Sequence, residues 1–215
     1  MLKKLIAIFL IAISAAIFSA DKYAILIAGN FDDSSVPTDK RWNDGLGNNT
    51  EFWNDLYLQW EMLYEKGYAK ENITVIFANE LDMWQEQDYY YIARRYRAAN
   101  ATDNELETIT NYSATKGNLT TAVEALSSKV GPDDFLYVWA MSHGGSPTQS
   151  SLYFNDGEML DTEFADLFNN VTANKKVFVI NANYAQGFLD KFTGENVSIQ
   201  INSKKEKRMM SDFLK

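Results

Sequence analysis

Four short runs of almost wholly apolar residues recur along the chain, and they limit its fold more than any other feature does. They cover residues 23–28, 73–78, 135–141 and 177–180. Runs of this length are typical of strands that are buried on both faces of a sheet. The segments between them are long enough for crossover helices, which implies parallel pairing of the strands. The sequence therefore predicts an α/β fold, with a mostly parallel central sheet flanked by helices.

Between and after these runs, apolar residues recur at helical spacing in three segments, at positions 52–63, 119–130 and 164–168. The first helix is expected to begin at Asn49 or Thr50 and to end at Gly67. The third is expected to begin at Asp161 or Thr162, because either side chain can cap the first free backbone N–H groups.

Three other segments have weaker patterns. Asp156 and Gly157 are a preferred pair for a tight turn, so residues 152–160 are expected to form a hairpin. Residues 81–97 are rich in tyrosine and arginine and are expected to be helical in part. Interleaved Tyr and Arg can stack on bases, but an acidic chain favours an insertion that packs or faces a partner. A weak last strand is predicted over residues 197–201.

The composition excludes several kinds of site. The 215 residues include no cysteine and one histidine, which excludes disulfides, thiolate metal sites, cysteine nucleophiles and polyhistidine metal sites. The formal net charge is −9, so the chain lacks the positive field that attracts nucleic acid phosphates. We therefore expect no cofactor, no metal and no nucleic-acid partner.

The N-terminus has the features of a signal peptide. Lys3 and Lys4 precede an apolar run over residues 5–13, and small residues follow up to Ala20. The run is shorter than the roughly 20 residues that a membrane-spanning helix needs. We expect residues 1–20 to be cleaved, which predicts a secreted or periplasmic protein with no membrane span; an uncleaved anchor is the alternative.

Seven Asn-x-Ser/Thr triplets are potential N-glycan acceptors. They begin at Asn48, Asn72, Asn100, Asn111, Asn118, Asn170 and Asn196. In a eukaryotic secretory route these triplets would accept glycans, whereas in a bacterium they would have no meaning. The chain is rich in asparagine, so chance occurrence is the competing explanation.

Two strings lie where the predicted strands end, and ligands bind at the carboxyl ends of strands in open parallel sheets. Ser142-His143-Gly144-Gly145 follows the third apolar run and contains the only histidine. An imidazole on such a loop can reach a substrate, and the N–H of Gly144 can donate to a developing oxyanion. The other explanation for a single histidine is a structural role. The second string, residues 181–188, follows the fourth apolar run.

Together these strings resemble the caspase and legumain group of cysteine endopeptidases, also called the hemoglobinase type. The resemblance covers about residues 22–202, and its most specific parts are the His143 loop and residues 184–188. It implies a caspase-like sandwich, with a catalytic histidine after one strand and a nucleophilic cysteine after the next. It also implies a peptidase domain over residues 21–203 that is truncated at the C-terminus, followed by a basic tail over residues 204–215.

The chain departs from the group at the nucleophile. In the family pattern, Tyr184 takes the aromatic position and Gly187 the second glycine, so the cysteine position falls on Asn183. The family mechanism needs a thiolate to form an acyl-enzyme, and an amide side chain cannot attack a peptide carbonyl. The resemblance therefore implies a site at His143, Gly144 and Asn183 in an inactive pseudopeptidase that binds peptide or protein.

Several alternatives remain open. An active peptidase with a relocated nucleophile would need Ser142 or Tyr184, and a non-catalytic remnant of the fold would need neither. In the family, the loop after the first strand helps to select substrates, and its candidates here are Asp32, Asp33, Asp39, Arg41 and Asp44. A flavodoxin-type fold would need a phosphate-binding glycine loop there, whereas acidic residues follow Gly29.

Overall fold

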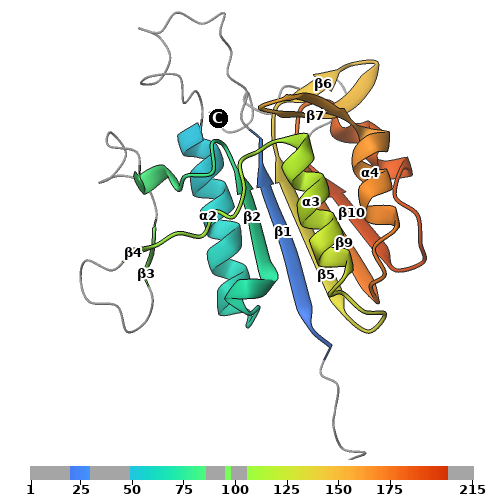
Figure 1. Cartoon of the computed structure of the whole chain (residues 1–215). Coiled ribbons are helices and arrows are strands. Elements are labelled where there is room, and N and C mark those ends of the chain that lie inside the picture. Colours follow the sequence, from blue (N-terminus) through green and yellow to red (C-terminus); the bar gives the residue numbers. More distant parts are fainter. Residues whose placement is uncertain (1–19, 30–48, 86–94, 98–105, 203–215) are drawn as a thin grey trace, which may run out of the picture.

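The computed structural model describes residues 20–29, 49–85, 95–97 and 106–202, and its centre is a five-stranded sheet (Figure 1). The strands are β1 (Lys22–Ala28), β2 (Ile73–Phe77), β5 (Phe135–Met141), β9 (Lys175–Asn181) and β10 (Val197–Ile201). Their order is β10-β9-β5-β1-β2, and every neighbouring pair is parallel. The predicted α/β class and all five predicted strands are confirmed.

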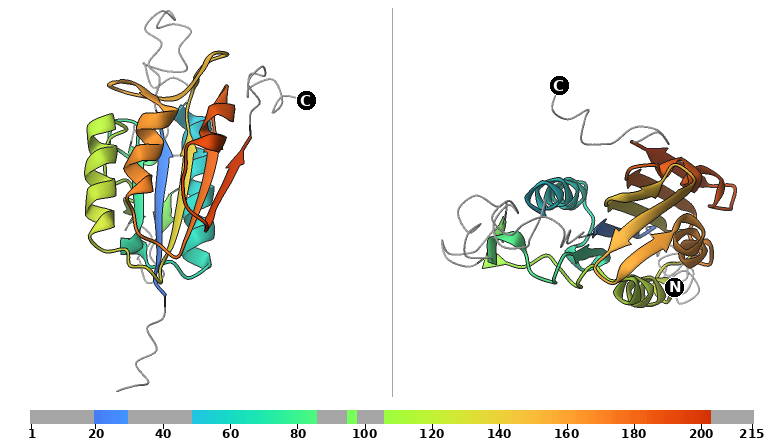
Figure 2. Two further views of the ribbon diagram at one scale, coloured as in Figure 1. Left: turned by 90° about the vertical axis from the view of Figure 1, so that its right-hand side faces the viewer. Right: turned by 90° about the horizontal axis from the view of Figure 1, so that it is seen from above.

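Helices cover both faces of this sheet (Figure 2). Helix α2 (Asn49–Glu65) lies on one face, and helices α3 (Lys116–Ser127) and α4 (Asp161–Asn169) lie on the other. Side chains along β1 alternate between the two layers, because successive residues of a strand point to opposite faces. Ile25 and Ile27 join the core beneath α3 and α4, whereas Leu26 joins the core beneath α2.

The helix ends show which local signals the fold uses. Gly67 follows α2 with a φ of +81°, a conformation that favours glycine, and Thr115 caps α3 by accepting a hydrogen bond from the N–H of Asn118 at 3.1 Å. Helix α4 begins at Asp161, but the prediction that Asp161 or Thr162 is its N-cap was wrong. Its N-cap is Leu160, whose backbone N–H donates to the carboxylate of Glu163 at 2.8 Å, and Asp161 is already helical.

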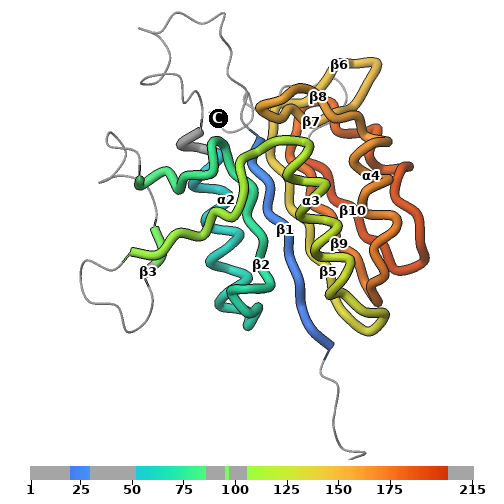
Figure 3. The backbone as a smooth tube through the Cα atoms, in the orientation of Figure 1, coloured from blue at the N-terminus to red at the C-terminus, as the bar shows by residue number. Residues whose placement is uncertain are grey.

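A small antiparallel sheet lies over the carboxyl end of the main sheet (Figure 3). Its strands are β6 (Gly144–Ser146), β7 (Gln149–Phe154) and β8 (Gly157–Leu160), in that order. The predicted hairpin is β7 and β8, with Gly157 at a φ of +119° in the turn. Strand β6 was not predicted, because a three-residue strand that begins with two glycines has no apolar pattern.

The tyrosine-rich segment is only partly described. Residues 83–85 form a short 3-10 turn, and residues 96–97 pair with residues 106–107 as the two-residue strands β3 and β4. The Tyr96 ring lies 4.7 Å from the ring of Trp60 on α2, and the Tyr57 hydroxyl donates to the carbonyl of Arg95 at 2.9 Å. These described parts of the segment therefore pack against α2; residues 86–94 lie outside the described residues.

Two tyrosines make the stability of the fold sensitive to alkaline pH: Tyr68, which is buried, and Tyr137, which is half-buried. Burial raises the pKa of Tyr137 to about 12. Burial, and to a smaller extent the charge of the neighbouring Tyr137, raises the pKa of Tyr68 to about 12 as well. Because these pKa values are higher in the folded than in the unfolded state, the protonated tyrosines stabilise the folded protein. This stabilisation is complete below about pH 10 and is lost as the pH rises from about 10 to 12. We expect the free energy of unfolding of the parent protein to fall over that pH window. The free energy of unfolding of the Tyr137→Phe variant should fall less, because the variant lacks one of the two titrating hydroxyls. Denaturant unfolding at several pH values checks this; equal losses in both proteins would contradict it.

In the described ranges, the structure contains no helix that combines the length and the apolar character needed to cross a bilayer. The predicted signal peptide, residues 1–20, lies almost wholly outside those ranges, and so does the basic tail over residues 204–215.

Candidate functional site

The two strings that follow β5 and β9 begin at the same level of the sheet. In the parallel register Met141 pairs with Asn181, and the N–H of Ser142 donates to the carbonyl of Asn181 at 3.1 Å. Neighbouring parallel strands thus deliver the residues after them to one edge, as expected for the carboxyl end of such a sheet.

Gly144 and Asn183 are in direct backbone contact at this edge. A Cβ atom placed on Gly144 in ideal geometry would lie 1.7 Å from the carbonyl oxygen of Asn183 and 2.8 Å from its nitrogen. Only a residue without a side chain fits so close an approach. Gly144 of the first string therefore lies beside Asn183 of the second, and His143 directly precedes Gly144 in the chain. That these three residues form a site stays a prediction.

The imidazole of His143 is half-buried and faces the helix that covers β1. Its ring centroid lies 5.6 Å from that of Phe52, in the first turns of α2, and the two planes are tilted by 59°. Phe52 is buried, so it forms an apolar wall on one side of the histidine. This contact holds the ring at the carboxyl edge of the sheet.

The chain turns sharply directly after Asn183. Tyr184 has φ 56° and ψ 29°, a left-handed conformation that is uncommon for a residue with a side chain. Such strained residues cluster at functional sites, where the surrounding structure holds them in place. The turn leads into a 3-10 helix over residues 185–190, in which Ala185 and Phe188 are buried.

One hydroxyl group supports this turn. Ser150 on β7 donates to the carbonyl oxygen of Tyr184, and its oxygen accepts from the N–H of Gly187 at 2.8 Å. A Cβ on Gly187 would lie 2.4 Å from a carboxylate oxygen of Asp161 and 2.5 Å from the Ser150 hydroxyl. Sequence reasoning missed Ser150, which stands in no motif, and it named Asp161 only as a capping residue of the third helix; only the folded structure brings both to the turn.

Removing this hydroxyl tests the support directly. Ser150→Ala is expected to reduce the free energy of unfolding by about 1–3 kcal/mol, because it leaves a carbonyl and an N–H group without partners. Ser146→Ala, at an exposed hydroxyl of the same small sheet, is the matched control and should change stability by less than about 0.5 kcal/mol. Chemical denaturation measures both. Equal values for the two variants would show that Ser150 does not support the turn.

Ser142 is not placed to act as a nucleophile. It is 2% exposed, its hydroxyl accepts from the N–H of Tyr153 at 2.9 Å, and that hydroxyl lies 2.7 Å from the Tyr153 carbonyl oxygen, to which it can donate. Its side chain thus contacts β7, whereas the ring of His143 contacts α2. The Ser142 hydroxyl thus has partners within the protein both as a donor and as an acceptor of hydrogen bonds, so it is not available to a substrate.

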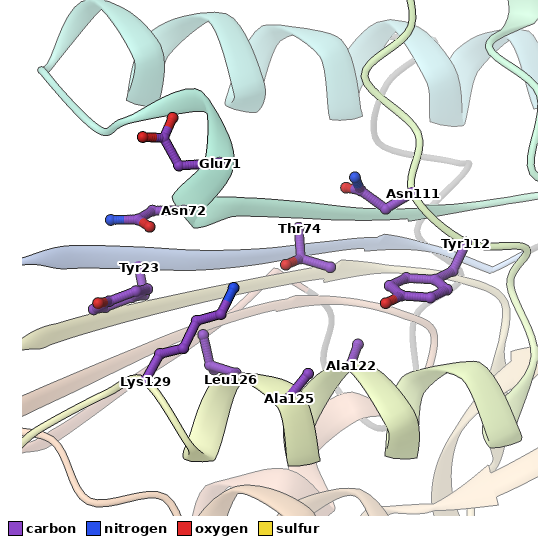
Figure 4. A pocket seen from close by; sticks show the side chains of 10 residues that line it. All are labelled: Tyr23, Glu71, Asn72, Thr74, Asn111, Tyr112, Ala122, Ala125, Leu126 and Lys129. Carbon is purple, nitrogen blue, oxygen red and sulfur yellow. The ribbon is translucent and has the colours of Figure 1, made fainter.

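The described structure has a polar hollow beside the turn and a second, unrelated hollow. The first is lined by Thr148, Gln149, Ser150, Asp161, Thr162, Gln186, Gly187, Asp190 and Lys191. The second lies between β2 and α3, where Leu126 of the helix and Lys129, two residues after its end, point toward the strands that include Thr74 of β2 (Figure 4). Thr74 lies near the start of β2, so this second hollow is remote from the carboxyl edge. The candidate substrate-selecting residues at 32–44 fall outside the described residues.

The site offers an imidazole, backbone N–H groups and an amide, but the whole chain contains no thiol. Among the described residues, no three His, Cys, Asp or Glu side chains come together in a way that could hold a metal ion. The chemistry that these groups support is hydrogen bonding to a polar chain, through the ring of His143 and the backbone around Gly144 and Asn183.

A model of the peptidase C13 family matches residues 52–213. Caspase-1 from Spodoptera frugiperda has a TM-score of 0.46 and 12% identity, over 85% of this chain and 58% of that one. A protein from Geobacter sulfurreducens has a TM-score of 0.44 and 14% identity, over 76% of this chain and 50% of that one. The chain thus spans between half and three fifths of these structures, and no curated protein matches it significantly.

The family match covers three quarters of the chain and includes His143, Gly144 and Asn183. It includes most of α2, the small antiparallel sheet and four strands of the central sheet. The resemblance predicted from the sequence is confirmed: the chain belongs to the peptidase C13 family, the legumain or hemoglobinase family.

Proposed function

We propose that the protein is a pseudopeptidase that binds an extended peptide or a loop of a partner protein at the carboxyl ends of β5 and β9. The contact between Gly144 and Asn183 carries this proposal. Asn183, whose side chain is an amide, lies beside the histidine loop, at the position where the family resemblance implies a cysteine. Loss of a nucleophile in a comparable hydrolase costs on the order of 10⁶ in turnover. Binding is what the remaining groups can perform.

The arrangement of polar groups supports a peptide as the ligand. An extended chain presents alternating carbonyl and N–H groups, which the loops around His143 and Asn183 can match with their own backbone groups. The polar hollow beside the turn continues this surface past Gly187 and contains Asp161, Asp190 and Lys191. Polar side chains of a ligand that reaches this hollow would find partners there.

Peptide binding is measured with a peptide array, followed by calorimetry on the strongest ligands. We expect binding without cleavage. We expect His143→Ala to raise the dissociation constant about tenfold, because the variant loses about one hydrogen bond to the peptide and the packing of the ring against Phe52. Ser146→Ala is the control and should bind as the parent protein does. Absence of any peptide ligand, or no effect of His143→Ala on binding, would remove the proposal.

We also propose that the protein is exported, either to the outside of the cell or to the periplasm. The positive, apolar and small-residue order of residues 1–20 supports this localisation. N-terminal sequencing of the protein from its natural source tests it: export predicts that the protein begins close to Asp21, and a protein that begins at Met1 would contradict it.

A further inference from the structure

The number of N-glycan acceptor triplets in this chain exceeds what its composition predicts. With 19 asparagines and 27 serines or threonines among 215 residues, random order would give about 2.4 such triplets, and the chain has seven. Five of the seven begin at described residues, which allows their environments to be compared. The atom that matters in each is Nδ2, because the glycan is attached there.

Two of the five described acceptors use that nitrogen inside the protein. Asn118 lies within α3, and its Nδ2 donates to the carbonyl and the hydroxyl of Ser113 at 3.1 and 2.8 Å. The next residue, Leu119, is completely buried, and the hydroxyl of Thr120 donates to a carbonyl within α3. Nδ2 of Asn170, at the end of α4, donates to the carbonyl of Asp166 at 3.2 Å.

The other three acceptors flank the two outer strands of the central sheet. Asn72 immediately precedes β2, and Asn111 belongs to the segment that hydrogen-bonds to the outer edge of β2. Asn111 already uses its side-chain oxygen to accept from the N–H of Val75 at 2.8 Å. Asn196 immediately precedes β10, at the opposite edge of the sheet.

Asn196 has the most open environment of the five. It is exposed, it lies in a turn, and only its backbone carbonyl takes part in the sheet, by accepting from the N–H of Lys176 at 3.0 Å. Its triplet ends at Ser198, an exposed residue of β10. No hydrogen bond of the Asn196 side chain to another described residue is found, so Nδ2 can be modified without breaking the fold.

Strand β10 is also the part of the sheet that a glycan would protect. It pairs with β9 on one side, and within the described ranges no strand pairs with its other side. Its side chains alternate between half-buried and exposed along the whole strand. An open edge of this kind is a template for pairing with other chains, and natural proteins cover such edges.

We infer that Asn196 is the site of an N-linked glycan, and that this glycan covers the open edge of the sheet at β10. In this modification a bond forms between Nδ2 and C1 of the first sugar, while the bond from C1 to the pyrophosphate of a lipid-linked oligosaccharide breaks. Nδ2 loses one proton, and the lipid pyrophosphate leaves. The inference needs export through a eukaryotic secretory route, but it is independent of peptide binding.

Mass spectrometry of the protein from its natural source tests the site. After treatment with peptide N-glycosidase, a glycosylated Asn196 is recovered as aspartate, and the intact mass falls by the mass of the glycan. We expect this conversion at Asn196 and none at Asn118. An unmodified Asn196 would overturn the inference, whether or not the protein binds peptides.

Matched variants, secreted from the natural source, test the protective role. Ser198→Ala removes the Asn196 triplet but keeps the asparagine, and Thr120→Ala removes the Asn118 triplet in the same way. We expect Ser198→Ala to lose one glycan and to aggregate at least about threefold faster in light scattering, and Thr120→Ala to keep the parent's glycan mass. If enzymatic removal of the glycan from the parent protein leaves its aggregation rate unchanged, the protective role is excluded.

Discussion

Asn183→Cys is expected to convert the protein into a thiol-dependent peptidase. The substitution places a thiol beside the His143 loop, and the imidazole can then generate the thiolate that forms an acyl-enzyme. We expect cleavage of a fluorogenic peptide library to rise over the parent protein by up to a factor on the order of 10⁶, the factor by which nucleophile loss lowers turnover. Alkylation of the thiol should abolish the gain.

Two further variants make this result specific. Asn183→Ser supplies a hydroxyl of similar size and is expected to be far less active than Asn183→Cys, because a hydroxyl gives up its proton much less readily than a thiol does. Asn183→Cys combined with His143→Ala should lose most of the gained activity, since the thiol then lacks its proton acceptor. If Asn183→Cys is inactive although its thiol reacts with small alkylating agents, Asn183 is not the nucleophile position or the substrate cleft is incomplete.

Gly144→Ala is expected to be among the most destabilising single substitutions in the protein. Its methyl group would lie 1.7 Å from the carbonyl oxygen of Asn183, and that oxygen belongs to the backbone and cannot rotate away. The loop after β5 or the turn after β9 must move, at a cost of about 3 kcal/mol. We expect the free energy of unfolding in urea to fall by this amount, and any bound peptide to be lost with the geometry.

Gly117→Ala is the matched control. Gly117 lies in the first turn of α3, and a Cβ placed on it has no neighbouring atom within 4 Å. Alanine is the better helix former, so this substitution should stabilise the protein by roughly 0.5 kcal/mol. If the two glycine substitutions changed stability equally, the close approach at Gly144 would not exist in solution.

The sequence predicted the strands and helices well where one physical signal dominates. Buried parallel strands are nearly continuous apolar runs, and each of the four runs became a strand. Strand β9 begins two residues earlier than predicted, at Lys175, because Lys176 is buried in it. Its ammonium group donates to the carbonyls of Phe168 and Val171 at the end of α4, and burial lowers its pKa. Nothing in the sequence indicates that a lysine has such partners.

The same limit applies to the site. His143, Gly144 and Asn183 could be predicted, because parallel strands bring the residues after them to a common edge. The role of Ser150 could not. Outside the site, neither could that of the buried carboxylate of Asp82, which accepts from the N–H groups of Ile109 and Thr110 at 3.0 Å. Both bind backbone groups of distant segments. Such partners are set by where loops meet in space, so neither spacing nor residue type reveals them.

The oxygen of Ser150 belongs to one strand of the small sheet but is bound twice to the turn that follows Asn183. A ligand that pushes β7 must therefore either carry residues 184–187 along or rupture both bonds in one event. While both bonds hold, β7 and residues 184–187 move together. In hydrogen exchange, the amide of Gly187 should become labile together with those of β7, at one common rate.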